Sequence, residues 1–209
     1  VRPVLADYYT QPKKATMVEI EDRELLRSAG GVELSFGKVL ATEHVTAYQK
    51  KQLSDNRVLE IVDLELPEQS FHTEGLWFAL PEAVTTAVSP PERLGALHAS
   101  EHGLIAMLPL FAMCDRWDIG GLSTEMHWQT GGPSIFVYDG HPGGIGITRK
   151  GFADFEELVA STHKLISSCR CEAGCPSCIQ SPKCGNLNEP LSKAGALQIL
   201  REIKKANPG

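Results

Sequence analysis

Five of the six cysteines lie in one C-terminal run, SSCRCEAGCPSCIQSPKCGN. They are Cys169, Cys171, Cys175, Cys178 and Cys184. Four thiolates can surround a single zinc ion tetrahedrally, with bonds of about 2.3 Å. The Gly and Pro residues between the cysteines are turn formers, so a short segment can bend around such an ion. The run therefore predicts a structural zinc site with four cysteine ligands.

The spacing leaves the fourth ligand open. Cys175 and Cys178 are the firmest pair, because a tight turn between them brings both sulfur atoms to one side, and Cys171 follows closely behind. Residues two apart in an extended segment share a face at roughly 7 Å, so Cys169 can join Cys171 if the chain bends. Cys184 lies in a Pro- and Gly-flanked turn that can equally fold back. Either Cys169 or Cys184 completes the predicted site.

Three alternative interpretations of these cysteines have less support than a zinc site. Disulfide frameworks suit small secreted chains without a core, whereas 209 residues with 42% hydrophobic content can bury one. A redox C-x-x-C pair is expected in a thioredoxin-like context, without three further thiols beside it. Iron–sulfur clusters also take four thiolates at related spacings, so the identity of the metal stays more open than metal binding itself.

The charge of the chain argues against a stand-alone nucleic-acid binder, because the net charge is −6 and the pI is about 5.7. Lys164, Arg170 and Lys183 lie near the cysteines. These three residues either balance a zinc–thiolate centre of net charge −2 or contact a DNA backbone. The sequence has no apolar run long enough to span a membrane and no initiator Met, and we expect it to be an excised part of a longer cytoplasmic protein.

Hydrophobic periodicity predicts an α+β fold, in which antiparallel sheet packs with three main helices and the four-cysteine zinc site lies near the C-terminus. Residues 1–89 are expected to form a β-rich part, and residues 90–209 a helical and β zinc-binding part, of one continuous domain. The expected strands are 17–21, 32–36, 43–51, 58–66, 122–129 and 134–139. The expected helices are 90–108, with a break at Pro109, then 152–167 and 192–205, the last capped by Ser192.

A second motif with possible metal chemistry is His98-Ala-Ser-Glu101-His102 on the first predicted helix. It fits H-x-x-E-H, in which two His ligands bind zinc and Glu acts as a base. However, His98 and Glu101 fall on the apolar stripe of the helix, which favours buried polar groups bonded to each other or to a neighbouring strand. A zinc metallohydrolase that uses these three residues is kept as an alternative function, and a protein-interaction module as another.

The turn from Tyr138 to Gly146 is rich in glycine and precedes a helix, so its amide groups could bind a phosphate. It lacks the Lys-Ser/Thr of a Walker A loop, and close packing braced by Asp139 and His141 is the favoured interpretation. Trp77, Trp117 and Trp128 lie in apolar sequence surroundings, which gives no clear prediction of exposed rings for base stacking.

Four segments together resemble one known family. They are Glu101-His-Gly-Leu, Cys114-Asp-Arg-Trp-Asp-Ile-Gly-Gly, the run from Ile135 to Gly146, and the run from Cys169 to Asn186. In this order they are similar to the C-terminal zinc-binding domain of mitomycin repair factor A helicases. The specific motifs extend from about residue 90 to residue 200.

The resemblance implies a parent protein that is a superfamily-two, ATP-dependent 3′–5′ DNA helicase acting in DNA repair. It also implies Cys169, Cys171, Cys175 and Cys178 as the zinc ligands, with Cys184 in reserve. The chain has no Walker A loop and no D-E-x-H box, so ATP and Mg²⁺ would belong to motor domains elsewhere in the same polypeptide. The expected role is structural and accessory: Zn²⁺ holds a corner that helps to guide single-stranded DNA, with Lys164, Arg170 and Lys183 as contacts and no catalytic residue.

Overall fold

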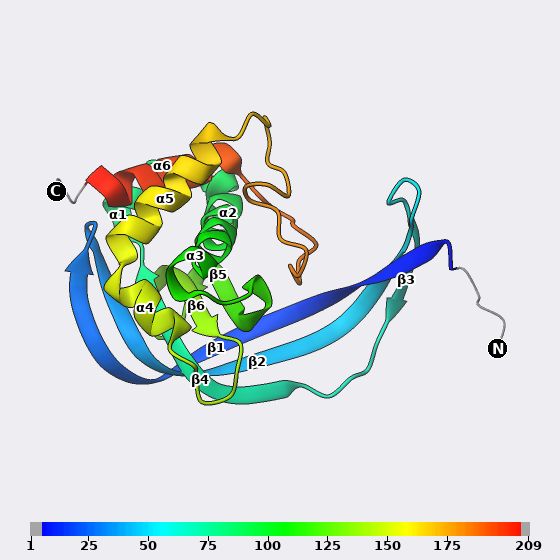
Figure 1. Ribbon diagram of the computed structural model, residues 1–209, viewed down its shortest axis with the longest axis horizontal. Coiled ribbons are helices and arrows are strands. Elements are labelled where there is room, and N and C mark those ends of the chain that lie inside the picture. The colour runs from blue at the N-terminus through cyan, green and yellow to red at the C-terminus, as the bar shows by residue number, and fades with distance from the viewer. Residues whose placement is uncertain (1–5, 206–209) are drawn as a thin grey trace.

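The computed structural model describes residues 6–205 and confirms an α+β fold built on an antiparallel sheet (Figure 1). The strands are β1 (Tyr8–Ala29), β2 (Val32–Gln52), β3 (Val58–Asp63), β4 (Gln69–Ala79), β5 (Ile119–His127) and β6 (Gly132–Asp139). The helices are α1 (Glu82–Thr85), α2 (Pro90–Met107), α3 (Pro109–Ala112), η1 (Arg116–Asp118), α4 (Ile147–Ala153), α5 (Phe155–Ser168) and α6 (Lys193–Lys205). Each expected strand overlaps one of these elements, but the expected strands 58–66 and 122–129 extend past the ends of β3 at Asp63 and β5 at His127.

Two long strands dominate the sheet. β1 and β2 pair antiparallel from Tyr8 opposite Gln52 to Ala29 opposite Val32, joined by the predicted Gly30-Gly31 turn. Gly30 has a φ of 55°, and a Cβ there would lie 2.5 Å from the carbonyl oxygen of Ile203, so this position requires glycine. One end of the ribbon therefore touches α6, and the other extends away from the helices (Figure 1).

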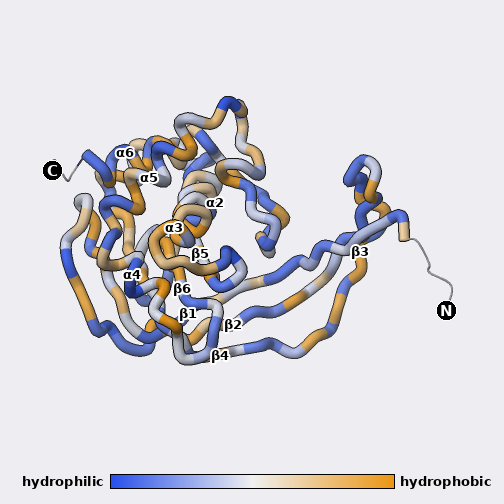
Figure 2. The backbone as a smooth tube through the Cα atoms, viewed as in Figure 1, coloured by the Kyte–Doolittle hydropathy of each residue, from blue (hydrophilic) through white to orange (hydrophobic). Residues whose placement is uncertain are grey.

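The strand order is β1-β2-β4-β6-β5, with β3 paired to the outer part of β2. β4 pairs with β6, so one sheet joins strands from the first half of the chain to strands from the second. Figure 2 shows short hydrophobic and hydrophilic stretches alternating along the long strands, as expected where each strand has two different faces. The division of the domain at residue 89 stays a prediction.

The helices cover one face of the curved sheet (Figure 1). α2 begins at Pro90 and ends before Pro109, as predicted, and the Ser192 hydroxyl accepts the Gly195 N–H at the start of α6. The expected helix from residue 152 is instead two helices, α4 and α5, which meet at Asp154. No helix of the described chain is long and apolar enough to cross a membrane.

The sheet buries both faces around the site. On the helix side, Leu76 and Phe78 of β4 pack into a core that includes Leu97 and Leu104 of α2. On the opposite side, Trp77 stacks on Phe136 with ring centroids 6.1 Å apart. Alternate residues of β4 thus serve two separate apolar clusters. The larger cluster fixes α2 on the sheet, and α2 carries the H-x-x-E-H motif.

Candidate metal centres and the surrounding cavity

Four cysteine sulfur atoms converge just after α5. Sγ of Cys169 lies 3.6 Å from that of Cys171 and 3.5 Å from that of Cys175. Sγ of Cys178 lies 3.5 Å from that of Cys171 and 3.8 Å from that of Cys175. A tetrahedral zinc with bonds of about 2.3 Å separates its sulfur ligands by about 3.8 Å. The four thiols therefore fit a zinc ion, and no disulfide joins them.

Short-range contacts shape this cluster. Cys169 directly follows the last residue of α5, so the helix fixes where the run begins. The Cys178 N–H donates to the Cys175 carbonyl at 3.0 Å, and the Cys175 N–H points to Cys178 Sγ at 3.4 Å. These bonds close the predicted knuckle. Amide donors to sulfur favour the thiolate form that a metal requires.

Lys193 is a member of this site that the sequence reasoning missed. Its buried ammonium donates to the carbonyls of Cys169, at 2.7 Å, and Cys171, at 2.5 Å, and lies 3.4 Å from Cys171 Sγ. Burial opposes ionisation of Cys171, but hydrogen bonds from Cys178, Cys169, Cys175 and Lys193 together lower its pKa to about 6. A buried Lys beside four thiolates offsets part of their charge. Its position at the start of α6, far from the cysteines in sequence, concealed this role.

Cys184 lies apart from the four, in a second cluster with His98 and His102 of α2. One ring nitrogen of each histidine and Sγ of Cys184 lie within 4.8 Å of one another, and all three residues are buried. Sγ of Cys184 is 3.3 Å from Nε2 of His98 and accepts the Asn188 N–H at 3.3 Å. The structure thus places Cys169 beside the other three cysteines and Cys184 beside the histidines.

Backbone carbonyls orient both imidazole rings. His98 Nδ1 is 2.9 Å from the Pro190 carbonyl oxygen, and His102 Nδ1 is 2.7 Å from that of Ile179. Because a carbonyl only accepts, each Nδ1 carries the proton and each Nε2 keeps its lone pair. Burial lowers the pKa of His98, and burial together with the neighbouring His98 lowers that of His102 to about 4. Both rings are therefore neutral at pH 7.

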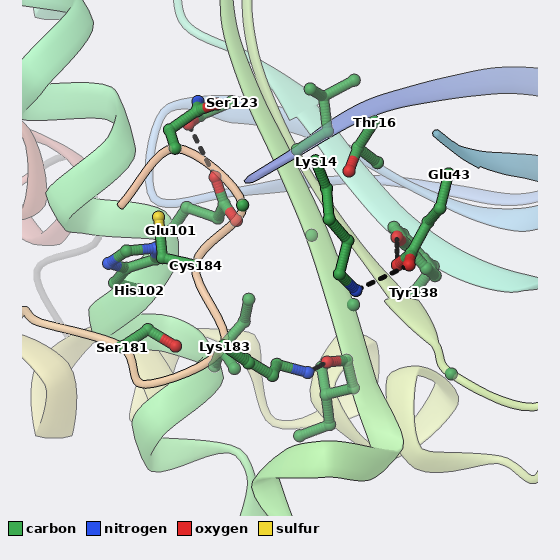
Figure 3. A pocket seen from close by; sticks show the side chains of 18 of the residues that line it. Lys14, Thr16, Glu43, Glu101, His102, Ser123, Tyr138, Ser181, Lys183 and Cys184 are labelled. Atoms are coloured by element: carbon green, nitrogen blue, oxygen red, sulfur yellow. Dashed lines mark hydrogen bonds and ion pairs between the residues drawn. The ribbon is translucent and has the colours of Figure 1, made fainter. Parts of the chain in front are cut away.

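A cavity of about 490 Å³ opens in front of this cluster. Figure 3 shows Glu101, His102 and Cys184 on one side of it, and Lys14 with Glu43 on the other. Lys14 donates to Glu43 at 2.8 Å. Of the two partners expected for Glu101, the structure shows the neighbouring strand: its carboxylate accepts the Ser123 hydroxyl of β5 at 2.6 Å. Burial raises the pKa of Glu101 to about 7.

The three basic residues considered for DNA contact do not form one group. Lys183 lines the cavity and donates to the Ile119 carbonyl, and burial lowers its pKa to about 8. Lys164 is exposed on α5, in a shallow hollow with Lys204. Arg170 is exposed between two of the clustered cysteines. Only Arg170 is adjacent in sequence to the four-cysteine centre while also facing solvent.

The glycine-rich turn is braced from inside. The fully buried Asp139 carboxylate accepts the N–H groups of Ile145, Ile147 and Thr148, and the Thr148 hydroxyl, at 2.7 to 3.2 Å. These amides at the start of α4 are the ones a phosphate would need, so the bracing interpretation holds. His141 ties the turn to η1, since its Nε2 lies 2.9 Å from Asp118 Oδ1.

The tryptophans differ in exposure. Trp77 is buried, whereas Trp117 is 66% and Trp128 is 71% exposed. Apolar sequence neighbours gave no basis for this distinction, because Trp117 lies in the short η1 turn and Trp128 just beyond the end of β5. The exposed rings of Trp117 and Trp128 therefore lie just before and just after β5.

The fold and the four-cysteine centre define a zinc-binding domain on a curved antiparallel sheet. The family model for the MrfA Zn-binding domain matches residues 100–179. Uncharacterized protein MJ1572.1 of Methanocaldococcus jannaschii is 37% identical over 110 residues, which are 51% of this chain and 98% of that protein. The chain belongs to the family of MrfA zinc-binding domains, and its cofactor is zinc.

Larger relatives contain this domain as one part. The uncharacterized ATP-dependent helicase YprA of Bacillus subtilis is 29% identical over 182 residues, 86% of this chain but 24% of the helicase. The crystal structure of DUF1998 helicase MrfA bound to DNA matches with a TM-score of 0.62 at 27% identity, covering 95% of this chain and 26% of that one. The chain thus spans about a quarter of the length of these two helicases.

Proposed function

We propose that this chain is the zinc-binding accessory domain of an ATP-dependent 3′–5′ DNA helicase that acts in DNA repair in the cytoplasm. The observation that carries the proposal is the likeness of 95% of the chain to part of MrfA, a helicase whose structure has been determined bound to DNA. ATP hydrolysis, with Mg²⁺, would belong to motor domains in the same polypeptide, the first partner of this domain. A metallohydrolase has no comparable support among the relatives.

In this proposal Cys169, Cys171, Cys175 and Cys178 bind the zinc ion. The sulfur separations of 3.5 to 3.8 Å support this set, as does the separate position of Cys184. Zinc then joins the end of α5 to the start of α6 through a segment with no regular secondary structure. The resulting fixed corner presents Arg170 to solvent.

The domain guides single-stranded DNA by contacts to the phosphate backbone. Arg170 and Lys164 are exposed cations, and Lys183 supplies positive charge inside the neighbouring cavity. Cation contacts of this kind give salt-dependent affinity. The exposed rings of Trp117 and Trp128 are suited to base stacking.

The test uses the complete polypeptide that contains this chain. Unwinding of a duplex with a 3′ single-stranded tail is expected to require ATP and to be lost in Cys171→Ser. Charge reversal of Lys164, Arg170 and Lys183 to Glu is expected to weaken binding to single-stranded DNA and to reduce its salt dependence. Lys38→Glu, on the exposed face of β2, is the matched control. Unchanged affinity and unwinding in the triple variant would remove the DNA-contact claim.

A further inference from the structure

The cluster of His98, His102 and Cys184 has the composition of a metal site. Imidazole and thiolate together suit zinc and related divalent ions. One donor atom from each residue lies within 4.8 Å of the others, in a buried position. We propose that these three residues bind a second zinc ion, separate from the four-cysteine centre, with an open coordination position toward the cavity.

The outer contacts of the imidazoles support this assignment. Metal-binding histidines donate their second N–H to a carbonyl or carboxylate, which fixes the tautomer and the ring plane. His98 and His102 both do so, through Nδ1 to the carbonyls of Pro190 and Ile179. The described chain provides no hydrogen-bond partner for Nε2 of His102, so its lone pair is available.

The surroundings of Cys184 allow its thiol to lose a proton and bind a metal as a thiolate. Its thiol lies 3.3 Å from Nε2 of His98, and its sulfur accepts the N–H of Asn188 at 3.3 Å. Binding Zn²⁺ breaks the S–H bond, releases that proton to solvent and forms a zinc–sulfur bond in its place. The step needs no oxidant or reductant. The Asn188 amide already points at the sulfur and stabilises the thiolate that results.

Charge balance is also available. Two neutral imidazoles, one thiolate and Zn²⁺ leave a net charge of +1, and the Glu101 carboxylate lies in the same cavity wall. Glu101 is held by the Ser123 hydroxyl at 2.6 Å and so is a neighbouring acidic group rather than a ligand. Lys183 lines the same cavity, and its side-chain nitrogen donates to the Ile119 carbonyl. The fourth position is left for water from the cavity of about 490 Å³.

The first measurement is a metal count. The purified chain is dialysed against excess zinc, desalted and analysed by inductively coupled plasma mass spectrometry. We expect two zinc ions per chain, and one in either Cys184→Ser or His102→Gln. The matched controls Cys114→Ser and His163→Gln, which alter residues outside both clusters, should keep two. One zinc in the unaltered chain at saturating zinc, or two in both site variants, would overturn the proposal.

The second measurement begins with the unaltered chain. Co²⁺ is added to the metal-free, unaltered chain while the sulfur-to-metal charge-transfer absorption is followed. The four-thiolate centre should give the stronger band and the His98–His102–Cys184 site a weaker band from a single thiolate. A second bound cobalt without a thiolate band, or no second cobalt, contradicts the site. In Cys169→Ser the weaker band should remain, which separates this outcome from loss of the four-cysteine centre.

Discussion

The two clusters of metal-ligating side chains are assembled in opposite ways. Residues 169–178 supply all four thiols of one cluster from a short segment without regular secondary structure. The other takes two histidines from α2 and one cysteine from a distant loop, and carbonyls fix both rings. The first cluster has little to hold its shape except its metal, whereas the second is already held by the core. Metal loss should therefore damage the two regions very differently.

Replacing a ligand in the four-cysteine cluster should have the largest effect. Cys171→Ser removes a thiolate from the centre that joins the cysteines of this segment, and we expect the free energy of unfolding to fall by roughly 5 kcal/mol. Denaturant unfolding and zinc content would measure this change. Cys114→Ser should stay close to the unaltered chain. If Cys171→Ser proved as mild as Cys184→Ser, the contrast between the clusters would fail.

Two titratable groups on α2, Glu101 beside the second cluster and His102 within it, give the stability of the chain opposing dependences on pH. Burial raises the pKa of Glu101 from 4.5 to about 7, so the folded chain keeps a proton that the unfolded chain releases, and this contribution to stability falls as pH rises through that window. His102, with its pKa lowered from 6.5 to about 4, acts in the opposite sense over a similar window. The two effects oppose each other.

Glu101→Gln removes only one side of this compensation. With zinc limited to one equivalent, we expect the stability of the variant relative to the unaltered chain to rise by on the order of 3 kcal/mol between pH 4.5 and pH 7. Urea unfolding across that range measures the difference. Glu157→Gln, on the exposed side of α5, is the control and should run parallel to the unaltered chain. A parallel curve for Glu101→Gln would show that the carboxyl group does not titrate in this way.

Replacing Lys193 should lower zinc affinity and stability by a smaller amount, through the four-cysteine cluster alone. Lys193→Met removes the ammonium that contacts two carbonyls and Cys171 Sγ, and we expect zinc affinity to fall about 10- to 100-fold and stability by about 2 kcal/mol. Competition with a chromophoric chelator would give the affinity. Lys204→Met, at the exposed end of α6, should leave affinity unchanged. An equal effect of the two variants would rule out the counterion role.

A substitution of Asn188 tests whether the loop that carries Cys184 is structurally independent of the four-cysteine cluster. Its side chain accepts the Ser181 N–H at 2.7 Å and donates to the Ser181 carbonyl at 3.0 Å. Glycine also accepts the φ of 66° found there, so Asn188→Gly should lose only these bonds, at about 1 kcal/mol. Zinc at the four cysteines should be retained. Loss of that zinc in the variant would mean that the two clusters are less separate than their geometry indicates.

The same contrast explains what could be predicted. The cysteines lie close in sequence, so their spacing predicted a four-cysteine centre but left Cys169 and Cys184 as alternatives for the fourth ligand, and only the family resemblance implied Cys169. Periodicity predicted α2 and the strands. Lys193 and Cys184 could not be placed, because their partners depend on how α6 and the loop before it pack on the rest of the domain. The one available signal was a leftover cysteine in a chain that also carries H-x-x-E-H.

The fold also explains errors of detail. A single helix was expected from residue 152, but α4 and α5 meet at Asp154, and periodicity cannot detect a change of axis between two amphipathic turns. The full length of β1 and β2 was missed as well. Their outer parts are half-exposed on both faces, so hydrophobic alternation fades while hydrogen bonding continues.

The carbonyl of Ile179 links the two clusters. Ile179 directly follows Cys178, and its carbonyl accepts the His102 N–H at 2.7 Å. A ligand that holds the knuckle in place therefore also favours one orientation of the imidazole. Thermodynamic reciprocity requires the converse. A ligand that holds His102 in that orientation must raise the metal affinity of the four cysteines by the same factor. The two regions thus meet at the peptide group of Ile179.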